Sequence, residues 1–166
     1  KVQYCDDDTL HRSCRVAYIW VRMTNMAEWY ADGLRFSCTQ CGNCCTGPPG
    51  AVWFNEDEGR AMAEKVGVSE DEFYKRFARK IGVRWSLKEN VIHGKYDCVF
   101  LDRKGKLPSC SLYEARPTQC RTWPFWPEVL KSRESWARTK VETPCPGMDE
   151  GKLLPIESIR IQRNQT

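Results

Sequence analysis

The most regular pattern of apolar and polar residues predicts two consecutive helices near the middle of the chain. The first begins after Asn55, because Glu58 three residues later completes a capping-box pattern, and it ends at Gly67. The second begins with the same kind of signal at Ser69. The apolar face of this second helix carries Phe73 and Phe77. Aromatic side chains at helical spacing are more typical of a core than of a ligand site, so we assign this face to the core.

Short apolar runs typical of strands occur on both sides of these helices. They occupy residues 51–54, 83–87, 91–92, 97–101 and 136–141. The polar residues 102–106 indicate a hairpin turn, and an amphipathic segment at 156–161 lies near the end of the sequence. The pattern therefore predicts an α+β fold of small helices and short strands joined by irregular segments.

Composition places the chain among globular proteins. It has 166 residues, 41% of them hydrophobic, which is enough for one domain with an apolar core. No apolar run is long enough to span a membrane, and no signal-peptide pattern is visible. The net charge of +4 does not by itself indicate nucleic acid. We assign the basic residues 131–140 to a solvated face, with a nucleic-acid contact as the alternative.

Cysteine supplies the candidate chemistry. Cys38, Cys41, Cys44 and Cys45 lie within eight residues, and the chain has 10 cysteines in all. A two-residue spacer lets neighbouring thiolates converge on one metal, whereas disulfide frameworks spread their cysteines so that each bridge closes a loop. The clustering and the adequate core argue against a disulfide scaffold and favour a reducing compartment. We therefore expect the fold to be organised around a cysteine-ligated metal centre.

Four further cysteines follow singly: Cys98, Cys110, Cys120 and Cys145. The first three clustered cysteines match the start of the bacterial ferredoxin run, in which a distant cysteine followed by proline completes a cluster, as in Cys145-Pro146. A zinc ribbon would need a second Cys-x2-Cys pair, and the sequence has none; His11 and His93 are its only histidines. The spacing therefore favours an iron–sulfur cluster, 4Fe-4S first, and leaves zinc open. It also leaves open whether there is one centre or two.

Two arginines flank Cys120, namely Arg116 and Arg121. Pro117 suits the first turn of a helix, which would place Cys120 and Arg121 on one side. Close to thiolates, these guanidinium groups would stabilise an anionic site and raise the potential of a redox cluster. Salt bridging or exposure to solvent is the alternative for both.

The order of these residues resembles a known family. A segment Trp29-Tyr30-x2-Gly33-Leu34-x-Phe36 precedes the clustered cysteines; Cys98-Val-Phe-Leu101 and Cys110-x2-Tyr113-x2-Arg116-Pro117-x2-Cys120-Arg121-x2-Pro124-Phe125 follow them. Over about residues 29–147 this combination resembles the CxxCxxCC family, which is described as zinc- or iron-chelating and includes flagellin lysine N-methylases. The resemblance implies metal binding at Cys38, Cys41, Cys44, Cys45, Cys98, Cys110 and Cys120, with Cys145 as the eighth ligand.

The resemblance also suggests how the chain is divided. Residues 1–28 form an N-terminal extension in which Cys5 and Cys14 are incidental thiols, residues 29–150 form the metal-binding domain, and residues 151–166 form a C-terminal tail. Lys1 in place of methionine indicates a removed targeting segment or a trimmed chain. We expect an organelle interior, the chloroplast stroma first, with the mitochondrial matrix and the bacterial cytoplasm as alternatives.

The family resemblance implies enzyme activity less directly, because the chain lacks a glycine-rich strand–turn–helix segment for a methyl donor. We expect a metal-binding protein with a structural or electron-transfer role, acting with protein partners as an accessory subunit of a larger complex. One alternative is a cluster-dependent enzyme of the lysine N-methylase type. Another is a zinc-stabilised interaction module whose partner surface would be Trp123, Phe125 and Trp126, although aromatic residues between prolines more often pack on their own core.

Overall fold

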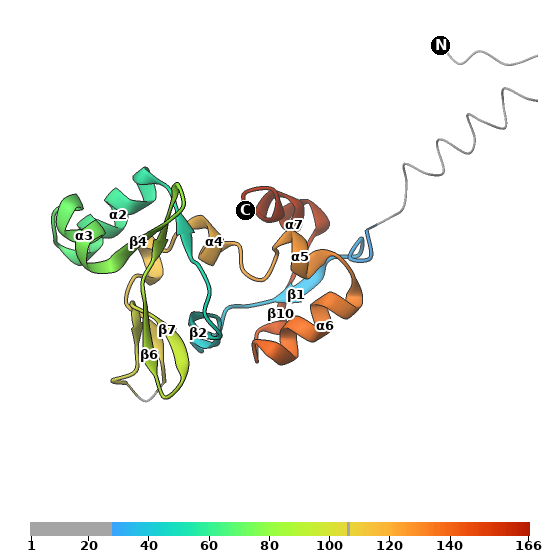
Figure 1. Cartoon of the computed structure of the whole chain (residues 1–166). Helices are drawn as coiled ribbons and strands as arrows, with labels where there is room; N and C mark the ends of the chain where they lie inside the picture. The colour runs from blue at the N-terminus through green and yellow to red at the C-terminus, as the bar shows by residue number, and fades with distance from the viewer. Residues whose placement is uncertain (1–27, 106) are drawn as a thin grey trace, which may run out of the picture. The chain divides into compact units, whose positions relative to one another are not determined.

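The computed structural model describes residues 28–105 and 107–166. The chain divides into two units, Lys1–Ala31 and Asp32–Thr166. The N-terminal extension expected at residues 1–28, with Cys5, His11 and Cys14, lies outside the described residues except for Glu28. The Asp32–Thr166 unit contains every element named below, and Figure 1 shows their arrangement.

The two predicted helices are confirmed as α2 (Glu56–Val66) and α3 (Glu70–Phe77). The capping box is complete, because the Glu58 amide donates to the Asn55 side chain and the Asn55 amide donates to the Glu58 carboxylate. Gly67 ends α2 with φ at 77°, a left-handed conformation that glycine adopts without strain. Phe73 is fully buried, as predicted.

The two helices pack with a three-stranded antiparallel sheet of order β3-β5-β4. Its strands are β3 (Trp53–Phe54), β4 (Ala78–Ile81) and β5 (Arg84–Leu87). We use the name aromatic core for the buried cluster Phe54, Met62, Ala63, Phe73, Ala78, Leu87, Phe100 and Leu112. Phe73 lies at its centre, with its ring 6.0 Å from Phe54 and 6.1 Å from Phe100 between centroids.

Two further antiparallel sheets lie in the middle part of the chain. One has the order β2-β7-β6, made of β2 (Thr46–Gly47), β6 (Glu89–Ile92) and β7 (Lys95–Cys98). The other pairs β8 (Leu101–Asp102) with β9 (Ser109–Cys110), and residues 103–105 of the turn predicted at 102–106 lie between these two strands. The strand predicted at 91–92 is part of β6, whereas the run predicted at 97–101 is divided between β7 and β8, which belong to different sheets.

The C-terminal third adds helices α4 (Thr118–Arg121), α5 (Pro127–Leu130), α6 (Arg133–Glu142) and α7 (Ile156–Arg163). Strand β10 (Met148–Leu154) pairs antiparallel with β1 (Leu34–Phe36), so that Leu34 lies opposite Leu154. Phe125 is fully buried between the rings of Phe36, 5.5 Å away, and Trp136, 6.1 Å away. The residues expected to form a C-terminal tail, 151–166, thus supply most of β10 and all of α7.

The strand predicted at 136–141 is wrong, because these residues belong to α6. The helix begins where the Ser132 side chain accepts a hydrogen bond from the Ser135 amide. Alternation over six residues does not separate a strand from a short helix that buries only Ser135 and Trp136. The α+β class is nevertheless confirmed. Among the described helices, none is both long and apolar enough to cross a membrane.

Candidate metal centre

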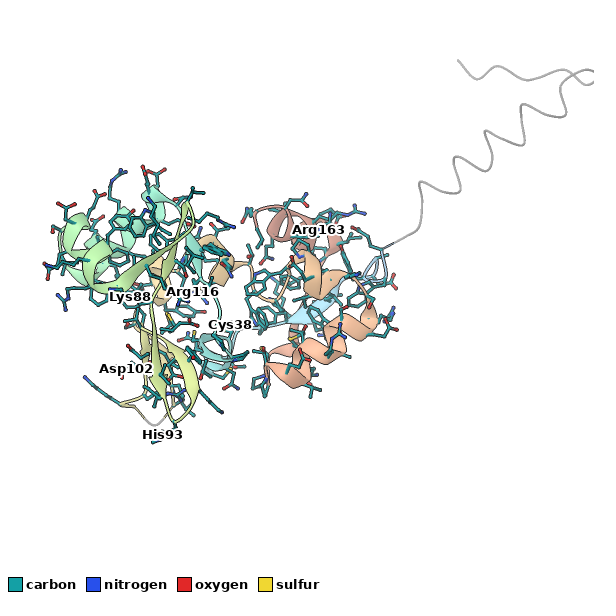
Figure 2. All side chains as sticks on the ribbon, in the orientation of Figure 1. Cys38, Lys88, His93, Asp102, Arg116 and Arg163 are labelled. Carbon is teal, nitrogen blue, oxygen red and sulfur yellow. The ribbon has the colours of Figure 1, made fainter. Side chains whose placement is uncertain are left out.

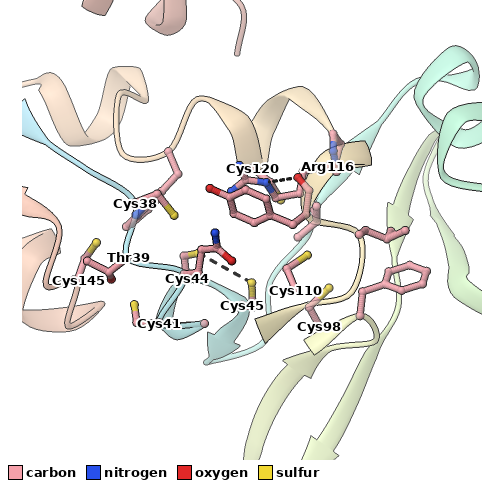
Figure 3. Close-up of a pocket in the computed structure, with 18 of the residues that line it drawn as sticks. Cys38, Thr39, Cys41, Cys44, Cys45, Cys98, Cys110, Arg116, Cys120 and Cys145 are labelled. Atoms are coloured by element: carbon pink, nitrogen blue, oxygen red, sulfur yellow. Dashed lines mark hydrogen bonds between the residues drawn. The ribbon is translucent and has the colours of Figure 1, made fainter. Parts of the chain in front are cut away.

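All the cysteines of the described residues line one cavity in the Asp32–Thr166 unit, here named the cysteine cavity (Figure 3). They are Cys38, Cys41, Cys44, Cys45, Cys98, Cys110, Cys120 and Cys145, and all are free thiols. The cavity volume is about 60 Å³, far below the several hundred Å³ typical of pockets for organic ligands. The fold therefore brings the four scattered cysteines to the four clustered ones.

The approach of Cys145 to the clustered cysteines depends on a close backbone contact. The Ser37 amide donates to the Gly147 carbonyl at 3.2 Å, and the Asn43 side-chain amide donates to the Pro144 carbonyl at 2.5 Å. A Cβ atom on Gly147 would lie only 2.1 Å from the Ser37 carbonyl oxygen. Glycine is thus required where the chain after Cys145 passes the residue before Cys38.

Another glycine shapes the loop that carries Cys44 and Cys45. Gly42 has φ at 74° and precedes the 3-10 helix η1 (Asn43–Cys45), in which the Cys45 amide donates to the Gly42 carbonyl at 2.9 Å. A Cβ atom on Gly42 would lie 2.9 Å from side-chain atoms of Leu101 and Pro108. The loop can therefore rest against the β8–β9 hairpin, whose last residue is Cys110.

A buried carboxylate joins the segments of Cys45 and Cys98. Asp97, only 2% exposed, accepts hydrogen bonds from Thr46 Oγ1 at 2.5 Å and from Arg103 Nε at 2.6 Å and Nη2 at 2.9 Å. The Arg103 hydrogen bond and charge hold the pKa of Asp97 below its ordinary value, against the effect of burial. Thr46 follows Cys45 and Asp97 precedes Cys98, so this contact sets the spacing of the two cysteines. Sequence reasoning missed it, since an acidic residue in a strand gives no sign of its distant partner.

A second carboxylate positions the helix of Cys120. Glu58 Oε1 accepts hydrogen bonds from the Thr118 amide and hydroxyl, both at 2.6 Å, at the start of α4. Because Glu58 also completes the cap of α2, one side chain joins the first turns of two helices. Pro117 precedes α4 as its N-cap, close to the predicted position in the first turn.

The cysteines differ in exposure and in pKa. Cys38 and Cys44 are exposed, whereas Cys145 is buried. Burial raises the pKa of Cys98 to about 11, and burial together with neighbouring cysteines raises the pKa of Cys120. The contact between the Cys44 and Cys45 sulfur atoms, 3.9 Å apart, lowers the pKa of Cys44 to about 7 and raises that of Cys45. Without a cation, therefore, the thiols of Cys45, Cys98 and Cys120 favour the protonated form at neutral pH.

Two groups of thiols can be distinguished in Figure 3. We call Cys38, Cys41, Cys44 and Cys145, toward the left of the view, the loop-side group. We call Cys45, Cys98, Cys110 and Cys120, toward the right, the strand-side group. Charges on Cys98 and Cys120 contribute to the raised pKa of Cys45, and the charge of Cys44 contributes to the raised pKa values of Cys98, Cys110 and Cys120, so Cys44 lies close to the strand-side group as well. The Cys44–Cys45 contact marks the boundary between the groups.

The two predicted arginines, Arg116 and Arg121, lie in different surroundings. Figure 2 shows all side chains and labels Arg116. Arg116 lines the cysteine cavity, with its guanidinium carbon 3.8 Å from the Tyr113 ring centroid. Burial raises the pKa of Cys110, and the charge of Arg116 offsets part of that increase. Arg121 does not line the cavity. It donates to Thr118 Oγ1 at 2.8 Å and lies 3.8 Å from the Glu58 carboxylate.

The donor set of the cavity fits a thiophilic metal. Among the described residues that line it, there is no carboxylate, imidazole or ammonium group beside the eight cysteines. Thiolates alone suit zinc and iron–sulfur clusters rather than magnesium or calcium. Nowhere in residues 28–105 and 107–166 do three His, Cys, Asp or Glu side chains already stand in position to hold an ion. Ligation would therefore require the cysteine side chains to turn toward common points.

Comparisons with known proteins agree with this donor set. No solved structure matches the chain. "Uncharacterized protein MJ0661" of Methanocaldococcus jannaschii is 34% identical over 105 residues, which are 63% of this chain and 52% of that protein. The chain thus spans about half the length of that curated relative. The CxxCxxCC family model, described as "Putative zinc- or iron-chelating domain", matches residues 37–146. The chain therefore belongs to the CxxCxxCC family.

Proposed function

We propose that this protein holds two 4Fe-4S clusters, one on each group of four thiols, and that it transfers electrons as a subunit of a larger complex. The observation that carries the proposal is the convergence of eight cysteines on one small cavity without carboxylate or imidazole donors. Each four-thiolate set would satisfy one cluster. When bound, a cluster supplies one-electron transfer and links the segments that ligate it.

The loop-side group supports the first assignment. Cys38, Cys41 and Cys44 have the spacing of the bacterial ferredoxin run, and Cys145-Pro146 has the form of its distant ligand. The contact of Gly147 with Ser37 carries Cys145 to this run. The strand-side group then takes Cys45 together with the three remaining cysteines, so that neighbours in sequence serve different centres.

Exposure and charge support the electron-transfer role. Because Cys38 and Cys44 are exposed, a partner protein could approach the edge of the loop-side centre without any opening of the fold. Arg116 is the one cation among the described lining residues, and it would offset part of the negative charge of the thiolates. We propose Arg121 as a support for Arg116, since its guanidinium donates to the Arg116 carbonyl. A reducing compartment, the chloroplast stroma first, would keep these thiols available for metal.

Zinc is the second candidate, and burial is the observation that favours it. Cys98, Cys110 and Cys120 are only partly exposed and Cys145 is buried, as is usual for ligands of closed structural zinc sites. In that case the metal would only hold the fold, and the protein would act as an interaction module.

Anaerobic purification followed by iron, acid-labile sulfide and zinc analysis separates these functions. We expect iron and sulfide in equal amounts, together with a visible absorption band that bleaches on reduction. Stoichiometric zinc without sulfide would replace the electron-transfer proposal by the structural one. A folded protein without metal, whose stability does not change in chelator, would contradict both.

Matched cysteine variants test the assignment of ligands. Cys145→Ala should remove the loop-side centre and Cys120→Ala the strand-side centre, each lowering the iron content by about half. Cys14→Ala is the control. Cys14 lies outside the described residues and was not assigned as a ligand, so this variant should keep its full iron content. Equal loss of all iron in both cavity variants would instead indicate a single shared centre.

A further inference from the structure

Trp123 lines the cysteine cavity and has a donor that nothing accepts. Its indole Nε1 is buried and has no hydrogen-bond partner within residues 28–105 and 107–166. The only other such atom in this part of the chain is Nε of Arg79, whose guanidinium still donates through Nη2 to Glu89. Since the indole has a single N–H, Trp123 is, among the buried side-chain donors of the described residues, the one whose whole donor capacity is unused.

A buried N–H without an acceptor lowers the stability of the fold, because the group loses its hydrogen bonds to water and gains none. Two other indoles in this region each have an acceptor. Trp126 Nε1 donates to the Gln119 carbonyl at 2.9 Å, and Trp136 Nε1 donates to Asp149 Oδ1 at 2.8 Å. Neither of these two residues lines the cysteine cavity. The orphan indole is thus associated with the cavity that is rich in sulfur.

The cysteines that line the cavity account for the missing acceptor of Trp123 Nε1. A neutral thiol is a weak acceptor, whereas a thiolate or an inorganic sulfide carries negative charge and accepts well. Metal ligation requires deprotonated cysteines, so the loaded cavity would hold strong sulfur acceptors that the free thiols do not provide. Trp123 also follows Cys120 by three residues, immediately after the C-cap residue of α4, and both residues line the cavity.

We propose that Trp123 Nε1 donates a hydrogen bond to a sulfur atom of the metal-loaded cysteine cavity, and so raises the reduction potential of the centre. The inference rests on the proposed iron–sulfur function. Reduction adds an electron to the centre and increases the negative charge on its sulfur atoms, so this hydrogen bond is stronger in the reduced state. Trp123 is therefore a residue that tunes the centre rather than a ligand.

The test compares Trp123→Phe with Trp136→Phe in the anaerobically purified full chain. Both changes replace an indole by a phenyl ring, and only the first removes a donor at the cavity. We expect Trp123→Phe to keep its iron and sulfide and to lower the midpoint potential in a redox titration. A change of about tenfold in the reduction equilibrium would be a shift of ~59 mV for a one-electron couple. Trp136→Phe should leave the potential unchanged.

A second variant guards against failure to fold. Site-specific 3-benzothienylalanine at position 123 keeps the bicyclic ring and replaces only the N–H by sulfur, and we expect the same negative shift. Equal potentials in the wild type and in both position-123 variants, at equal iron and sulfide content, would overturn the inference and leave the proposed function intact. A wild-type protein without iron and sulfide would instead overturn the proposed function.

Discussion

The aromatic core and the cysteine cavity are neighbours that are stabilised by different means. They share walls, since Leu87, Phe100 and Leu112 belong to both. On the core side, rings pack against rings, for example Phe77 on Phe100 with centroids 5.0 Å apart. On the cavity side, eight thiols surround a void, and the only contact among them that meets hydrogen-bond distance in the described residues joins Cys44 and Cys45.

This difference indicates which part of the fold depends on metal. The aromatic core gains its stability from apolar area removed from water, a term that needs no cofactor. Thiols around a void contribute little packing, and their charged form is unfavourable until a metal binds. The core should therefore fold by itself, whereas the segments that meet at the cavity should depend on the metal to stay together.

Metal removal should have the largest effect and should act on the cavity alone. Chelator treatment after oxidation is expected to lower the free energy of unfolding by several kcal/mol, since structural metal sites contribute on the order of 10 kcal/mol in small zinc domains. Hydrogen exchange should rise around Cys38 and Cys145 and stay slow in α2 and α3. Uniform loss of protection in α2 and α3 as well would show that the core is not independent.

A substitution in the aromatic core should lower stability without removing metal. Phe73→Ala empties the centre of the aromatic core and should cost about 3–5 kcal/mol of unfolding free energy in denaturant titrations. Iron per folded molecule should stay the same, because Phe73 does not line the cavity. Val83→Ala is the control, since Val83 is 91% exposed and its truncation should change stability by less than about 0.5 kcal/mol.

Gly147→Ala tests how the cavity is assembled. The added methyl group would meet the Ser37 carbonyl and push apart the segments of Cys38 and Cys145. We expect Gly147→Ala to lower the free energy of unfolding by about 1–3 kcal/mol and to contain less iron in the loop-side centre. In Gly50→Ala the new atom would lie 3.9 Å from its nearest neighbour, so this variant should behave as the wild type. Full iron content in Gly147→Ala would show that the contact is dispensable.

The smallest effect should come from Glu58, which links core and cavity. Burial alone would raise its pKa, but the Thr118 hydroxyl, the Asn55 and Thr118 amides and the Arg121 charge together hold it below the ordinary 4.5. Since the folded-state pKa is the lower one, the stabilisation is complete above about pH 4.5 and is lost as the pH falls through the folded value. The acid decline in unfolding free energy should be shallower in Glu58→Gln. Identical pH profiles would mean that the carboxylate charge is not involved.

Local features of the fold could be predicted because the interacting groups are neighbours in sequence. The capping box of Asn55 and Glu58 and the end of α2 at Gly67 depend on side chains that bond to their own backbone. The helix α6 was missed because its polar surface gives little periodicity and its start depends on a single cap at Ser132. The β1–β10 pairing joins Leu34 to Leu154, and such a pairing leaves no local trace.

The candidate donors of this protein can be identified from its sequence, because cysteine is the only residue type here that offers clustered soft ligands at the spacing a metal needs. Which of these donors meet depends on the folded chain. Gly147 passing Ser37, Asp97 joining Thr46 to Arg103, and Glu58 capping α4 are contacts between residues far apart in the chain. They form because backbone donors and buried charges must find partners in the folded state, a requirement that spacing alone does not encode.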